Sequence, residues 1–280
     1  MRSSSDTPTP LDSDGALRAL QARGRYLLRA TEFAVMTGRE PDGPAVKAAL
    51  ARLSRSNKIA SLVKRPSTWL IVPPEQAAYG APPVTWWIED FLRPEEPSYY
   101  VALLSAARYW GSSHYALQTT QVMVSRKRAQ LKVGRLTVDF TVKTEAGRTP
   151  TVQARGGVAA YRVSTREATL LDLMRHSKDV GGLEAFTRVA KDFAPSMTDQ
   201  GLTEALDAMA QTAVAQRVGF VLSHLPKKRH KQVERWLADR RTRREPLERA
   251  APITGESVLF SPEWSIEYTP RQLELIKELA

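Results

Sequence analysis

The segment from Pro44 to Ser56 (PAVKAALARLSRS) most constrains the fold, because it combines one apolar stripe with a face that carries cations and no acids. Its apolar residues recur with the spacing i, i+3, i+4 and i+7, which predicts a helix with one buried side. The buried stripe consists of Val46, Ala49, Leu50 and Leu53. The opposite face carries Lys47, Ala48, Ala51, Arg52 and Arg55. Small residues beside cations allow such a helix to approach a phosphate backbone closely.

Two shorter helices precede this segment, and a hairpin follows it. We expect helices over 16–23 and 32–37, each closed by a glycine in the usual C-cap position. Residues 59–64 and 68–72 are β-prone runs on either side of an Arg65-Pro66-Ser67 turn, which predicts a hairpin. Three helices and a hairpin in this order are typical of a winged helix-turn-helix domain, whose third helix enters the major groove.

The charge of the same region supports DNA binding. Residues 47–65 contain cations and no acid. We therefore predict that DNA is contacted by Lys47, Ala48, Ala51, Arg52, Arg55, Lys58, Lys64 and Arg65. The alternative is that these cations form the solvated face of an ordinary surface helix.

Composition is that of a globular protein with a polyanionic partner. The 280 residues are 42% hydrophobic and 25% charged, which excludes a wholly disordered or collagen-like chain. Forty-one Lys and Arg against 30 Asp and Glu give a net charge of +11, which favours nucleic acid or another anionic surface. The absence of cysteine excludes disulfides and thiolate metal sites and fits a cytoplasmic location. No apolar run reaches about 18 residues, so we expect no membrane partner.

Prolines and glycines between residues 73 and 84 predict a linker that divides the chain. Before this linker we expect a disordered tail over 1–15 and the winged helix-turn-helix domain over 16–72. After it we expect a larger domain over 85–280, in which strand patterns precede helical ones. The predicted fold class is therefore α+β, with a small sheet plus a helix bundle in the second domain.

The second domain begins with two predicted helices over 85–92 and 98–109. Strands are predicted over 121–125, 136–143, 149–154 and 158–163. Ser164 and Glu167 have the spacing of a capping box before a helix. Further helices are predicted over 183–193, 203–210, 213–224 and 228–241, then strands over 257–260 and 264–268 and a final helix from Pro270.

The sequence offers no known catalytic signature. It has no phosphate-binding loop, no dinucleotide-binding glycine motif and no metalloprotease or serine-hydrolase motif. Its four histidines are scattered, so we predict no metal site and no cofactor. Asp139 lies in a predicted strand, but Thr141 occupies the position two residues before Lys143, where a metal-dependent nuclease needs an acid. We expect a binding protein, and the alternative is a nuclease or DNA-repair enzyme targeted by the winged helix.

Two more basic segments lie in the second domain. The first carries Arg126, Lys127, Arg128, Lys132 and Arg135 without an acid. The second, 227–244 (KKRHKQVERWLADRRTRR), predicts a very basic helix. It is either a solvated surface helix or an electrostatic surface for nucleic acid or for an acidic partner.

Two motifs resemble the AbiEi family of antitoxins, from bacterial type IV toxin–antitoxin and abortive-infection (phage defence) systems. The first is Tyr99–Ala107 (YYVALLSAA), and the second is Val163–Leu173 (VSTREATLLDL). Together with the winged-helix pattern and the strand with its basic loop between them, the resemblance covers about residues 16–225. The chain departs from the family at the wing, where Thr68-Trp69 stands in place of a frequent Gly–Tyr pair.

The resemblance implies that the N-terminal domain binds inverted repeats in the promoter of its own operon and represses transcription. It also implies that the larger domain neutralises a nucleotidyltransferase-like toxin encoded alongside, with no need for a tight complex. For this role we expect a surface formed by Arg126, Lys127, Arg128, Lys132 and Arg135. That surface would either dock on an acidic face of the toxin or compete for a shared nucleic acid.

Overall fold

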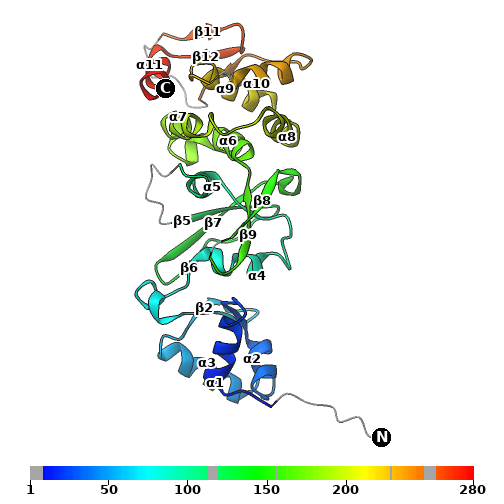
Figure 1. Cartoon of the computed structure of the whole chain (residues 1–280), viewed down its shortest axis with the longest axis vertical. Coiled ribbons are helices and arrows are strands. Elements are labelled where there is room, and N and C mark those ends of the chain that lie inside the picture. Colours follow the sequence, from blue (N-terminus) through cyan, green and yellow to red (C-terminus); the bar gives the residue numbers. More distant parts are fainter. Residues whose placement is uncertain (1–8, 113–118, 156, 228, 249–256) are drawn as a thin grey trace, which may run out of the picture.

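The computed structural model describes residues 9–112, 119–155, 157–227, 229–248 and 257–280. Figure 1 shows an elongated molecule with the N-terminal helices at one end, a sheet in the middle and helical layers at the other end. Helices and small sheets occur in separate blocks, so the fold class is α+β, as predicted. Residues 1–8 of the predicted tail, and Lys228 at the start of a predicted helix, lie outside the described ranges.

The first block contains the three helices and the hairpin that the sequence predicts. They are α1 (Ser13–Gln21), α2 (Ala30–Met36), α3 (Pro44–Arg55), β2 (Ile59–Val63) and β3 (Thr68–Ile71). Helix α1 begins inside the predicted tail of 1–15, because the Asp12 side chain caps it by accepting a hydrogen bond from the Gly15 amide. A short strand, β1 (Leu27–Arg29), was not predicted and pairs antiparallel with β3. Three residues are too few to show an alternating pattern.

The predicted linker is packed into the molecule. Its residues form η1 (Pro74–Tyr79) and the start of η2 (Val84–Trp86), followed by α4 (Ile88–Leu92). One continuous cluster of buried side chains joins Phe33 and Leu70 of the first block, Trp87 after the linker, and Val122 and Val138 of the central sheet. The first block and one face of the central sheet therefore share a hydrophobic core.

The central sheet has six strands in the order β6-β7-β5-β4-β9-β8. Their bounds are β4 (Tyr100–Val101), β5 (Thr119–Val124), β6 (Leu131–Val133), β7 (Leu136–Val142), β8 (Thr151–Arg155) and β9 (Ala160–Ser164). The predicted helix over 98–109 is wrong in its first part. Tyr100 and Val101 pair with β5 and β9, and only Leu103–Tyr109 forms helix α5. A short apolar run in a buried strand cannot be distinguished by periodicity from a buried helix.

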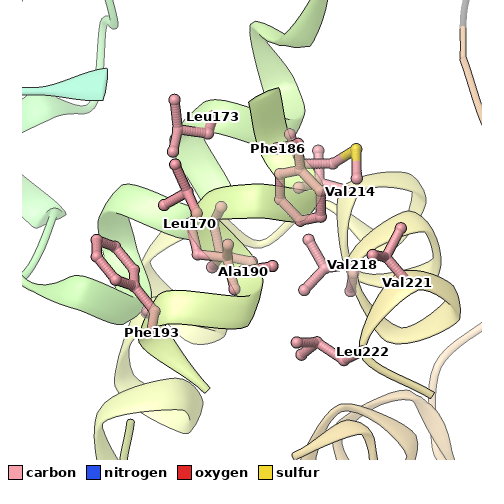
Figure 2. Packing of buried hydrophobic residues seen from close by; sticks show 14 of the residues in the cluster. Leu170, Leu173, Phe186, Ala190, Phe193, Val214, Val218, Val221 and Leu222 are labelled. Carbon is pink, nitrogen blue, oxygen red and sulfur yellow. The ribbon is translucent and has the colours of Figure 1, made fainter. Parts of the chain in front are cut away.

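A layer of helices lies beyond the opposite face of the sheet and meets it through α5 and α6 (Arg166–Arg175). The layer also contains α7 (Gly182–Phe193), α8 (Asp199–Met209), α9 (Thr212–Ser223) and α10 (His230–Leu237). Figure 2 shows Leu170, Phe186 and Val218 pointing toward one another in the core of this layer. The predicted capping box is displaced by one residue. Thr165 caps α6 by accepting from the Ala168 amide, whereas the Ser164 hydroxyl pairs with that of Thr169 at 2.7 Å.

The chain ends in a small sheet and a helix, as predicted. Strands β11 (Leu259–Ser261) and β12 (Ile266–Tyr268) pair antiparallel, β10 (Glu245–Pro246) joins β12, and α11 (Pro270–Leu279) follows. Trp264 lies against Gly219 of α9, where an added Cβ would be 2.0 Å from a ring carbon. Among the helices within the described ranges, none has the length and apolar character needed to cross a membrane.

Candidate functional site

Helix α3 presents the basic face that the sequence predicts. Its apolar stripe is buried, and it begins with Pro44 in the first turn, where the missing amide hydrogen costs no hydrogen bond. All five residues predicted for the opposite face are exposed: Lys47, Ala48, Ala51, Arg52 and Arg55. Arg52 and Arg55 lie in the last turn, where the helix dipole stabilises cations. The exposed side of α3 can therefore face a polyanion.

Lys58 differs from the other predicted DNA contacts, because it has a partner within the molecule. Its ammonium group lies 2.8 Å from both carboxylate oxygens of Asp14 on α1. Sequence reasoning missed this pair, since the two residues are 44 positions apart. Lys58 therefore offers less charge to an external phosphate than the cations of α3.

The tip of the β2–β3 hairpin lies close to the central sheet. Lys64 and Arg65 are exposed there. Arg65 and Pro66 line a groove of about 270 Å³ together with Arg128, Leu131 and other residues of the sheet and α4. The structure thus brings the hairpin tip close to the basic segment 126–135, although the two segments belong to different predicted domains.

The segment 126–135 is part loop and part edge strand. Arg126 and Lys127 are exposed in the loop, and Lys132 is exposed on β6. Arg128 is partly buried and forms a 2.9 Å salt bridge with Glu95. Arg135 is exposed, and its amide donates to the carbonyl of Tyr79 at 2.8 Å, which fastens the strand to the segment before α4. The freely presented cations are therefore Arg126, Lys127, Lys132 and Arg135.

The third basic segment, 227–244, pairs several of its cations within the molecule. Arg229 lies 3.2 Å from Asp199, Arg240 lies 3.4 Å from Asp207, and Arg244 lies 2.5 Å from Glu267. Only His230–Leu237 forms α10, which is shorter than the predicted helix over 228–241. The geometry favours a largely structural role for these arginines.

A buried ionic network links the central sheet to α6. Lys143, at the end of β7, lies 2.7 Å from Asp172 of α6, and both side chains are almost fully buried. The hydroxyl of Tyr100 on β4 donates to the other oxygen of Asp172 at 2.8 Å and accepts from Thr149 at 3.3 Å. Burial and the charge of Asp172 raise the pKa of Tyr100 well above its usual value.

The sequence carried only a weak signal for this network. Asp172 is the one charged residue in an apolar helix segment (LLDLM). A carboxylate in such a segment is seldom buried without a partner, so its position hints at a buried cation. Asp139, weighed as a nuclease carboxylate, lies elsewhere on β7 and accepts a hydrogen bond from Gln130. Across the described parts of the chain, no group of three or more His, Asp and Glu side chains is arranged to hold a metal ion.

His176 follows α6 and is partly buried near the network. Burial lowers the pKa of its imidazole, and the charge of Asp172 opposes this shift without reversing it. Its Nε2 atom is buried and has no hydrogen-bond partner among the residues that the structure describes. The fold therefore favours the neutral form of His176.

Comparisons with known proteins identify the region that holds this network. Residues 100–224 match the family model of the AbiEi antitoxin C-terminal domain. The crystal structure of the RV2827C protein from Mycobacterium tuberculosis resembles this chain with a TM-score of 0.62 and 16% identity, over 93% of this chain and 94% of that chain. At this identity the similarity shows a common fold. No curated protein matches the sequence. Residues 100–224 thus carry an AbiEi antitoxin C-terminal domain, which indicates an antitoxin of a toxin–antitoxin system.

Proposed function

We propose that this antitoxin also represses its own operon, with the first block acting as a winged helix-turn-helix domain that binds inverted repeats in the promoter. The observation that carries the proposal is the exposed, acid-free face of α3 beside the β2–β3 hairpin. We further propose that it is a type IV antitoxin of a cytoplasmic phage-defence system and that it neutralises a nucleotidyltransferase-like toxin. AbiEi antitoxins are generally not enzymes, which supports binding rather than catalysis as its role.

In this proposal α3 enters the major groove. Ala48 and Ala51 allow the helix to come close to the groove floor, while Lys47, Arg52 and Arg55 contact phosphates and base edges. Lys64 and Arg65 at the hairpin tip contact the flanking backbone. Lys58 contributes little, because Asp14 already neutralises it.

DNA binding is tested with a duplex carrying the chain's own promoter and the variant Arg52→Ala/Arg55→Ala. The slope of log K against the logarithm of the salt concentration is negative, and each phosphate contact adds about 0.9 to its magnitude. Losing two contacts should lower the magnitude of the slope by about 1.8 and weaken DNA binding about 60-fold near 0.1 M salt. The matched control is Lys191→Ala/Lys277→Ala, which removes the same charge from exposed positions on α7 and α11, at the opposite end of the molecule (Figure 1). An unchanged slope in the α3 variant would contradict the assignment.

For neutralisation we propose that the exposed cations Arg126 and Lys127 dock on an acidic surface of the toxin. The test is growth rescue in cells that express the neighbouring nucleotidyltransferase gene. Arg126→Glu/Lys127→Glu should abolish rescue and leave promoter binding intact. Arg128 is kept in this variant, because it pairs with Glu95 and lines a groove with Arg65. Full rescue by the folded variant would refute the docking surface, and an RNA gel shift by the antitoxin alone would favour competition for nucleic acid.

A further inference from the structure

A pocket unrelated to α3 and to the segment 126–135 lies between the sheet and the helical layer. Its volume is about 410 Å³, and it lies where the end of β7 and the η3 turn (Ala146–Arg148) meet the turn between α8 and α9. The lining residues include Lys143, Arg148, Arg175, Met209 and Gln211. This volume is within the range of small-molecule sites, roughly 300–1,000 Å³. The function proposed above leaves this pocket unused.

Three cations and one carboxylate, Glu145, line the pocket, and the cations differ in how their charge is matched. Lys143 is paired with Asp172 at 2.7 Å, and Arg148 is paired with Glu145 at 3.1 Å. Within the described ranges, no carboxylate lies within salt-bridge distance of Arg175. The hydrogen bond that its Nη1 donates goes to the thioether of Met209 at 3.8 Å, which is a weak acceptor. A partly buried guanidinium with unused donors therefore faces the pocket and favours an anionic ligand.

The surroundings of Arg175 add to this preference. The turn that lines the pocket leads directly into α9, whose N-cap Gln211 forms no side-chain cap. The positive end of the helix dipole adds to the field of the cations. Ala208 and Met209 provide an apolar wall beside the charged one.

We propose that this pocket binds a nucleoside polyphosphate. Arg175 and Arg148 contact phosphate oxygens from two different elements, α6 and η3, whereas the charge of Lys143 is already matched by Asp172. The space exceeds what inorganic phosphate fills, and the apolar wall at Ala208 and Met209 accommodates the base. This assignment is independent of DNA binding and of the docking surface.

The test is titration calorimetry of the full chain with ATP, pyrophosphate, inorganic phosphate and adenosine. We expect saturable binding of ATP and weaker binding of pyrophosphate. Arg175→Met and Arg148→Met should each weaken ATP binding about tenfold or more, because each removes a charge-assisted hydrogen bond. Arg175→Lys should keep part of the affinity, since it keeps the charge but loses the planar fork. The matched control is Arg188→Met on α7, which pairs with Glu184 on the surface as Arg148 pairs with Glu145.

Circular dichroism of each variant separates lost binding from lost folding. If Arg175→Met does not fold, Arg148→Met decides, because its side chain is 59% exposed and its removal leaves the core intact. The proposal would be overturned if the wild type shows no saturable ATP binding. It would also be overturned if Arg175→Met and Arg148→Met both bind ATP as tightly as the wild type. Binding of pyrophosphate without ATP would reduce the pocket to a simple phosphate site and overturn the nucleotide assignment.

Discussion

Replacing Lys143 with Met tests whether the buried network holds the sheet and helical layers together. The Lys143 side chain is 6% exposed and that of Asp172 is 0% exposed, so water cannot replace the missing ammonium group. In the variant, Asp172 keeps the Tyr100 hydroxyl but loses its cation. A buried carboxylate without its counter-charge is strongly destabilising.

The expected cost is large compared with the total stability. Breaking a buried ion pair by removing one partner costs about 3–5 kcal/mol, against roughly 5–15 kcal/mol for a whole domain. For a chain of this size, each kcal/mol lowers the melting temperature by roughly 2–4 °C, so a loss of about 10 °C is expected. The double variant Lys143→Met/Asp172→Leu should recover most of this loss, because both charges are then absent.

Urea and thermal unfolding followed by circular dichroism measure these differences. The control is Lys178→Met, an exposed lysine on η4 (Ser177–Asp179), which should change stability by less than about 0.5 kcal/mol. A loss below about 1 kcal/mol in Lys143→Met would refute the reasoning. A double variant as unstable as the single variant would do the same.

Three further predictions follow from the same structure. Because the folded state lowers the pKa of His176, the unfolded chain binds the imidazole proton more tightly, so the free energy of unfolding should fall as pH drops from about 7 to 5. His176→Gln should remove this contribution to the pH dependence. Curves of stability against pH that run parallel for the variant and the wild type would contradict the prediction. A fragment that begins at Val84 should bind a hydrophobic dye and melt below the full chain, because it exposes Trp87 and Val122; a fragment of full stability would show that the shared core is unimportant. Gly219→Ala should lose about 1–3 kcal/mol through overpacking against Trp264, whereas Gly147→Ala, with its nearest neighbour at 3.5 Å, should lose less than about 1 kcal/mol by chemical denaturation; equal losses would argue against the close packing.

The sequence was most informative where a pattern was long and local. The apolar stripe of α3, the hairpin after it and the start of α11 at Pro270 each depend on residues that lie close together in the sequence, and each was predicted. Short elements were missed. The strands β1, β4 and β6 span two or three residues, and their position depends on partners that lie far along the chain.

The candidate sites divide in the same way. The exposure of Arg52 and Arg55 followed from helical spacing alone. The pair of Lys58 with Asp14, and that of Lys143 with Asp172, join residues 44 and 29 positions apart, so no local pattern could reveal them. The packing of segment 73–84 was missed for a related reason. Proline and glycine indicate turns, and they carry no information about what packs against those turns.

Repression through α3 is tested most directly in cells that also carry the gene of the proposed toxin. A reporter fused to the chain's own promoter and growth after toxin induction are read in the same culture. We expect that Arg52→Ala/Arg55→Ala releases the reporter and still rescues growth, because the proposed function places DNA binding on α3 and the antitoxin domain in residues 100–224. Wild-type repression by this variant would contradict the proposal that α3 is the DNA-reading helix of this antitoxin.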